Sequence, residues 1–126
     1  METKNYKEGH VIISEGEISS NAYIILNGSV KVVKSMPDGK DKVLAVLTEN
    51  QIFGECGLVD TLPRTASCVA DSPYVQVGIV TKDNYEKLFE NNPKALLPIM
   101  KIVIERMRNT VGFIEKIYNE QQGGAI

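Results

Sequence analysis

From Phe53 to Ser67 the chain reads FGECGLVDTLPRTAS, and the rest of the sequence is interpreted around this stretch. Gly54 and Gly57 allow the backbone to turn closely around another group. Glu55 and Arg64 are opposite charges among apolar residues, so each needs a hydrogen-bonding partner if it is enclosed. A small ligand that carries a phosphate and hydroxyl groups would supply both partners, and the stretch therefore predicts a ligand pocket.

This order of residues resembles the phosphate-binding cassette of cyclic nucleotide-binding domains. Such domains occur in kinase regulatory subunits, catabolite activator proteins and cyclic nucleotide-regulated channels. The match runs without a gap from Phe-Gly-Glu to Pro-Arg-Thr-Ala-Ser. Turn sequences at 15–17 and 27–30 sit where the family has turns between early strands, and the resemblance covers about residues 6–118.

Short apolar runs separated by turn residues predict β-strands before residue 81. The expected strands are 10–13, 22–26, 29–35, 42–48, 67–70 and 74–80. Asn27-Gly28 is a hairpin signal, so the strand that follows it is expected to pair with the strand before it. Many short strands of this kind indicate a sandwich or barrel. The resemblance implies a mainly β fold with α, an antiparallel β jelly roll (double-stranded β-helix) followed by C-terminal helices.

After residue 80 the apolar period becomes helical. Thr81 can cap a first helix, and Asn92 with Pro93 can start a second one. Pro98 either delays the second helix or kinks its first turn. An apolar stripe then recurs at spacings of three and four, through Leu96, Met100, Val103, Met107, Val111, Ile114 and Tyr118.

Length and charge fit one small regulatory module. The 126 residues suit a single domain over 1–126, with a jelly roll over about 6–80, helices over about 81–119 and a frayed tail over 120–126. The net charge of −2 and the scattered basic residues argue against direct nucleic-acid binding. Neither a leader nor an apolar run of roughly 18 residues is apparent, so we expect a cytoplasmic protein without a membrane segment.

The resemblance assigns a role to each cassette residue. Arg64 would bind the exocyclic phosphate oxygens through a charge-assisted fork, and Glu55 would accept from the ribose 2′-hydroxyl. Gly54 and Cys56 would present backbone N–H groups to the phosphate from a short helical turn. Thr65 could bond the phosphate and the amino group of guanine, or it could simply open a strand. The ligand is therefore cAMP or cGMP, with cAMP the preferred guess.

Further contacts follow by analogy with the family. Ala66 completes the cassette, and apolar walls for the base and sugar would come from Val32, Ala45, Leu47 and Phe53. The long helix would cap the base and bring Arg106, Met107 and Thr110 over the pocket. Arg106 could stack on the purine, while the alternative is a solvated helix charge.

The function implied is that of a sensor that binds a cyclic nucleotide without catalysis, needs no cofactor and converts binding into movement of the C-terminal helix. The effector that this movement controls is not encoded in the chain. A rival reading is an interaction module that has lost its ligand and forms a homodimer through the helix stripe. In that reading Glu55 and Arg64 form an internal salt bridge.

A second rival is a metal-dependent enzyme on a similar roll. That chemistry needs a cluster of histidines and carboxylates, whereas this sequence has the single histidine His10. We therefore expect no enzyme and no metal. The two cysteines, Cys56 and Cys68, are too few for a disulfide framework and are expected to be buried, reduced thiols.

Overall fold

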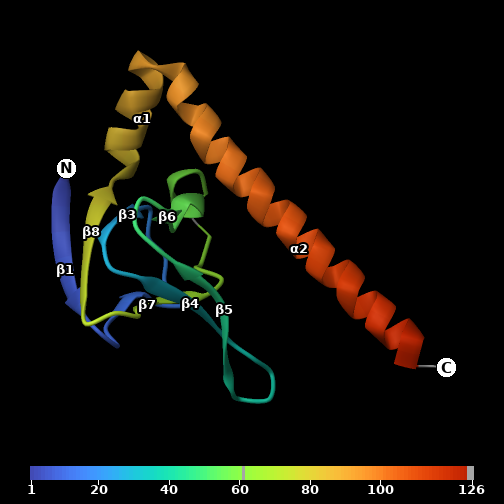
Figure 1. Cartoon of the computed structure of the whole chain (residues 1–126). Coiled ribbons are helices and arrows are strands. Elements are labelled where there is room, and N and C mark those ends of the chain that lie inside the picture. The colour runs from blue at the N-terminus through green and yellow to red at the C-terminus, as the bar shows by residue number, and fades with distance from the viewer. Residues whose placement is uncertain (61, 125–126) are drawn as a thin grey trace. The chain divides into compact units, whose positions relative to one another are not determined.

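The structure is a computed structural model that describes residues 1–60 and 62–124 (Figure 1). It divides into two compact units, Met1–Lys87 and Leu88–Ile126, with the boundary inside the first helix. Each unit is described by itself. The prediction that residues 1–126 form one domain stays a prediction.

The first unit is built from two antiparallel sheets. One sheet has the strand order β1-β8-β3-β6 and the other the order β2-β7-β4-β5. The strands are β1 Glu2–Lys7, β2 Val11–Ile13, β3 Ala22–Asn27, β4 Val30–Ser35, β5 Asp41–Leu47, β6 Ile52–Phe53, β7 Ser67–Ala70 and β8 Tyr74–Val80. A short 3-10 helix, η1, covers Glu55–Leu58 between β6 and β7.

The core lies between the two sheets. Strand β7 shows why: Cys68 and Ala70 are buried, while Ser67 and Val69 alternate with them and point away. Both sheets contribute to the buried cluster, which contains Ile12, Ile13, Ile25, Val30, Leu47, Phe53, Cys68, Ala70, Val75 and Val77. These side chains leave one face of each sheet buried and the other open.

The predicted hairpin at Asn27-Gly28 is wrong. Strand β3 pairs with β8 and β6, whereas β4 pairs with β5 and β7, so the turn carries the chain from one sheet to the other. Gly28 adopts a φ of +89°, and its neighbour Ser29 donates its N–H to Ser72 Oγ at 3.0 Å. Bonds to the Asp71–Pro73 turn region thus replace the hairpin bonds that a two-residue connection would make.

The second unit is helical. The first helix, α1 (Lys82–Asn91), begins after Thr81, whose hydroxyl accepts from Asn84 N–H at 3.2 Å, as the capping prediction requires. A 3-10 turn, η2, covers Pro93–Ala95, and α2 runs from Leu96 to Gly124. Pro98 therefore lies in the first turn of α2, where a missing N–H donor costs nothing.

Three further expectations need correction. The helix α2 continues to Gly124 instead of ending near 119, so the tail is helical as far as it is described. Its i→i−4 backbone bonds persist there without an apolar pattern to mark them. The sheet begins at Glu2, because β1 adds a strand before the expected start at residue 6. Cys56 is exposed rather than buried, since η1 buries its neighbours Glu55 and Gly57. Cys68 is buried, and neither of these two cysteines forms a disulfide.

Candidate ligand site

The cassette connects β6 to β7 and contains η1. Gly54 precedes η1 in the left-handed region at a φ of +71°. An ideal Cβ on Gly54 would lie 2.8 Å from Ile13 Cδ1 and 3.3 Å from Arg64 Nη1. One on Gly57 would lie 2.5 Å from Ser19 O and 2.8 Å from Arg64 Nη1. The two glycines therefore make the space in which the guanidinium of Arg64 lies.

Backbone carbonyls hold that guanidinium. Arg64 Nη1 donates to Gly54 O at 2.8 Å, and Nη2 donates to Asn21 O at 2.5 Å. The side chain is buried, with 9% of its surface exposed, and Nε has no hydrogen-bond partner among the described residues. A buried cationic N–H without an acceptor is costly, so the site is one hydrogen-bond acceptor short at this atom.

The main chain of Arg64 is tied to the loop between β2 and β3. Gly16 N–H donates to Arg64 O at 2.8 Å, and Arg64 N–H donates to Glu17 O at 2.9 Å. The same loop supplies Asn21 O to the side chain. Main chain and side chain are thus fixed by one segment, which preorganises the guanidinium before any ligand arrives.

Glu55 is the other buried charge of the cassette. It opens η1 and is 6% exposed, and Glu55 and Arg64 are the only charged side chains that are buried within the described residues. In the chain Glu55 lies between Gly54 and Gly57, the two glycines that are packed against Arg64. Both residues are buried, which is compatible with the predicted roles of Arg64 as the phosphate ligand and Glu55 as the acceptor for the ribose hydroxyl.

The remaining cassette residues are more open. Thr65 and Cys56 are exposed, and Ala66 is half-buried at the approach to β7. Thr65 directly follows Arg64 and precedes β7, so it lies outside regular secondary structure. Contacts of Thr65, Cys56 or Ala66 with a ligand stay predictions.

The predicted apolar walls lie on three strands. Phe53 and Leu47 are buried in the core, Val32 is half-buried, and Ala45, the register partner of Val32, is exposed. Phe53 stacks on Tyr23, with ring centroids 5.3 Å apart and an interplanar angle of 19°. Burial raises the pKa of the Tyr23 phenol, which stays neutral over the usual pH range.

The predicted lid residues belong to the second unit. Arg106 is half-buried on α2, Met107 is exposed, and Thr110 donates its hydroxyl to Arg106 O at 3.0 Å, one turn earlier. Their placement relative to the cassette is not defined between separate units. The lid role of these three side chains remains a prediction.

Sequence reasoning missed the loop that positions Arg64. Asn21 O, Gly16 N–H and Glu17 O are backbone groups more than forty residues away from Arg64 in the chain, and no side-chain pattern marks them. The role of Gly57 was predicted only in part. Its presence in the cassette indicates that another group lies close to its backbone, but the sequence does not say which group. Here the group is Arg64 itself.

Two features of the described residues concern membrane insertion and metal binding. None of the described helices combines the length and apolar character needed to cross a membrane. Within the same residues, no three His, Cys, Asp or Glu side chains come together in a way that could hold a metal ion. His10 is exposed, and its Nδ1 accepts from Lys7 N–H at 3.4 Å.

Comparison with known proteins identifies the fold and the family. Residues 3–92 match the family described as the cyclic nucleotide-binding domain. The chain belongs to this family. It is 26% identical over 110 residues to a CRP-like cAMP-activated global transcriptional regulator of Mycobacterium tuberculosis, a match covering 87% of this chain and 49% of the relative.

Two further comparisons show how widely this cyclic nucleotide-binding domain is used. A cGMP-dependent protein kinase of Plasmodium berghei is 31% identical over 133 residues, covering 95% of this chain and 15% of the kinase. The crystal structure of the Thermus thermophilus catabolite activator protein matches with a TM-score of 0.85 at 22% identity, over 92% of this chain and 54% of that one. This likeness confirms the jelly-roll fold. The chain spans about half the length of the first curated relatives it matches.

Proposed function

We propose that this chain is a regulatory sensor that binds cAMP, and less tightly cGMP, in the cassette between β6 and β7. The observation that carries the proposal is the buried Nε of Arg64, which lacks a hydrogen-bond acceptor while both terminal nitrogens are held by carbonyls. A phosphate oxygen would supply that acceptor and would balance the buried positive charge.

The buried carboxylate supports the same proposal. Glu55 lies in the cassette, and a ribose 2′-hydroxyl is a donor that a buried carboxylate can accept. Names of relatives support both candidate ligands, since one is cAMP-activated and another is cGMP-dependent. The apolar residues Val32, Ala45 and Leu47 would then face the sugar and base.

Nucleotide binding would change the position of the helical unit without any catalysed reaction. A ligand that contacts both the cassette and α2 favours the state in which they are close, so binding free energy becomes helix movement. Arg106, Met107 and Thr110 are the proposed contacts from α2. Exposed apolar residues on that helix, including Met100, Val103, Val111 and Ile114, offer a seam for a homodimer.

Calorimetric titration of nucleotide-stripped protein with cAMP, and separately with cGMP, tests the proposal. We expect saturable one-to-one binding, tighter for cAMP. The absence of binding to folded protein would favour the interaction module, whose test is the concentration dependence of its oligomeric state.

The variant Arg64→Ala should lower cAMP affinity by about thirty- to several-thousand-fold, because removal of one partner from a buried charge pair costs roughly 2–5 kcal/mol. Lys40→Ala, in the exposed turn between β4 and β5, is the control and should bind normally. Circular dichroism and thermal unfolding establish that Arg64→Ala is folded at the titration temperature. Unchanged affinity in folded Arg64→Ala would remove the cassette from the binding site.

A further inference from the structure

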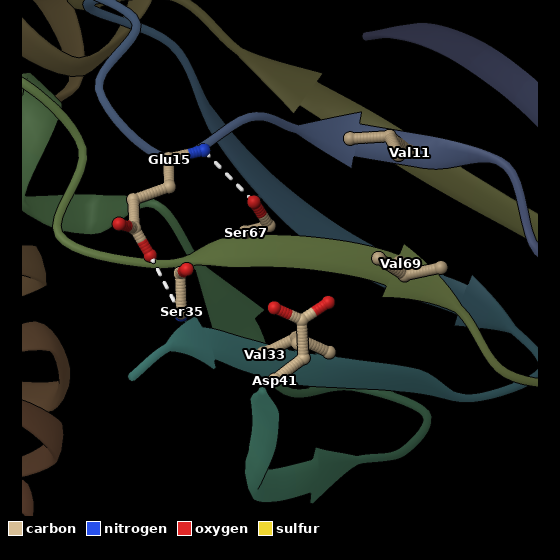
Figure 2. A pocket seen from close by; sticks show the side chains of 7 residues that line it. All are labelled: Val11, Glu15, Val33, Ser35, Asp41, Ser67 and Val69. Atoms are coloured by element: carbon tan, nitrogen blue, oxygen red, sulfur yellow. Dashed lines mark hydrogen bonds between the residues drawn. The ribbon is translucent and has the colours of Figure 1, made fainter. Parts of the chain in front are cut away.

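A second concave site lies on the open face of the sheet β2-β7-β4-β5 (Figure 2). We call it the outer hollow. Its volume is about 230 Å³, and it is lined by Val11, Glu15, Val33, Ser35, Asp41, Ser67 and Val69. Ser67 is the last residue of the cassette, but neither it nor any of the other six is a proposed nucleotide contact, and all seven lie in the first unit.

The floor of the outer hollow is apolar. Val11 on β2 is directly opposite Val69 on β7, and Val33 on β4 is directly opposite Ser67. Residues opposite each other in antiparallel strands share a face, so three valines from three neighbouring strands form one surface. Val11 is 52% exposed, which leaves this surface open to an aliphatic group.

The rim of the outer hollow carries two carboxylates, those of Glu15 and Asp41. The Glu15 carboxylate accepts from Ser35 N–H at 3.2 Å and pairs with Lys34 Nζ at 3.3 Å, while Glu15 N–H donates to Ser67 Oγ at 2.9 Å. The bond from Ser35 and the pairing with Lys34 lower the pKa of Glu15, so it is ionised at neutral pH. Figure 2 shows the carboxylate of Asp41 beside Val33, at a second point of the rim.

We propose that the outer hollow binds the side chain of a lysine or arginine of a partner protein. The aliphatic stem would lie on the three valines, and the cationic head would lie between Glu15 and Asp41, with the hydroxyls of Ser35 and Ser67 as further acceptors. An apolar floor with anionic groups at its rim matches this amphipathic side chain. The cationic head would share Glu15 with Lys34 and would add a positive charge beside Asp41, whereas a wholly apolar ligand would contact neither carboxylate.

The test is a nuclear magnetic resonance titration of the full chain with n-butylammonium and n-butylguanidinium chloride. We expect saturable shifts of the methyl signals of Val11, Val33 and Val69, with midpoints in the millimolar range because the site is open to water. Sodium n-butyrate and 1-butanol, which have the same number of carbon atoms as n-butylammonium, are the anionic and neutral probes. Absent shifts with the cations, or equal shifts with butanol or butyrate, would overturn the proposal.

A pair of variants tests whether the Asp41 carboxylate binds the cationic head of the probe. Asp41→Asn should raise the midpoint for n-butylguanidinium several-fold, because it removes one rim carboxylate. Asp38→Asn, in the neighbouring turn and outside the hollow, should leave the midpoint unchanged. Both aspartates are exposed, so both variants should keep the fold. Equal midpoints for Asp41→Asn and the unmodified protein would show that the hollow does not recognise charge.

Discussion

Carbonyl oxygens, rather than a carboxylate, orient the terminal nitrogens of Arg64. Gly54 O and Asn21 O fix the plane of the guanidinium through two hydrogen bonds. A carbonyl carries only a partial charge, so these bonds orient the cation without cancelling its charge. The full positive charge is therefore still available to an anion at Nε.

Gly57 tests this arrangement. Gly57→Ala should destabilise the protein by about 1–3 kcal/mol, because the new Cβ would meet the backbone oxygen of Ser19 as well as Nη1 of Arg64. It should also weaken cAMP binding by displacing the guanidinium. Urea unfolding and calorimetry measure the two effects.

The matched control for Gly57→Ala lies in α2. Gly112 has no atom within 4 Å of an added Cβ, so Gly112→Ala should stabilise the helix by about 0.5–1 kcal/mol. A neutral Gly57→Ala with normal binding would contradict the crowding seen around Arg64.

Glu15 makes stability depend on pH. Its pKa is lowered in the folded state by the Ser35 N–H bond and by Lys34, so its contribution is complete above the ordinary value of 4.5. That contribution is lost as the pH falls through the lowered pKa. Glu15→Gln should therefore be less stable than the unmodified protein at pH 7, and the difference should shrink towards pH 3.

Thermal unfolding midpoints measured at both pH values check this prediction for Glu15. Glu8→Gln, in the exposed turn between β1 and β2, serves as the control for loss of a negative charge. A difference between Glu15→Gln and the unmodified protein that stays constant down to pH 3 would contradict the linkage.

At the level of elements, the sequence predicted strands well where turns bound them and poorly elsewhere. Strands β7 and β8 match their predicted limits, because Asp71-Ser72-Pro73 separates two apolar runs. Strand β1 was missed since it is an edge strand with one half-buried residue, Tyr6, and so has no apolar alternation. The cassette was predicted because its residues are contiguous, whereas the loop that holds Arg64 is distant in sequence.

The turn at Gly28 shows why a local hairpin signal failed. An added Cβ would lie 2.4 Å from Tyr74 O and 2.6 Å from Ser72 Oγ, so the turn packs against the β7–β8 connection instead of closing a hairpin. Gly28→Ala should therefore cost more than the roughly 1–2 kcal/mol of a left-handed alanine. Urea unfolding measures the loss.

Gly39→Ala separates conformation from crowding in this experiment. Gly39 has a φ of +83° and nothing within 4 Å of an added Cβ, so its alanine variant should show the conformational cost alone. Similar losses at Gly28 and Gly39 would mean that the contact with Tyr74 adds nothing.

At the scale of the whole molecule, the buried core and the long helix belong to two separate units. Within the described residues, the buried hydrophobic side chains lie between Ile12 and Ile79, so the core belongs to the first unit alone. The helix α2 carries exposed apolar residues along its length and would gain from a partner or a ligand. A nucleotide held by both units would give α2 that contact only when it is bound.

Arg106 tests the coupling between the units. Arg106→Ala should weaken cAMP binding by less than Arg64→Ala does and should change the ratio of cAMP to cGMP affinity, because its proposed contact is with the base. Arg108→Ala, exposed on the same helix, should change neither quantity. Calorimetry measures the affinities for both nucleotides. An equal loss of cAMP and cGMP affinity in Arg106→Ala would contradict the lid role.

The pairing of β1 with β8 also has a consequence for biosynthesis. Glu2 lies opposite Ile79 and Lys7 opposite Tyr74. Strand β1 therefore pairs with a strand that lies roughly seventy residues later in the chain. At about 5–20 residues per second, the ribosome takes several seconds to make that partner. Throughout this interval β1 has no partner in its sheet, and β3 can pair only with β6. The nascent chain therefore cannot close this sheet step by step, and the sheet can form only after nearly the whole first unit has been synthesised.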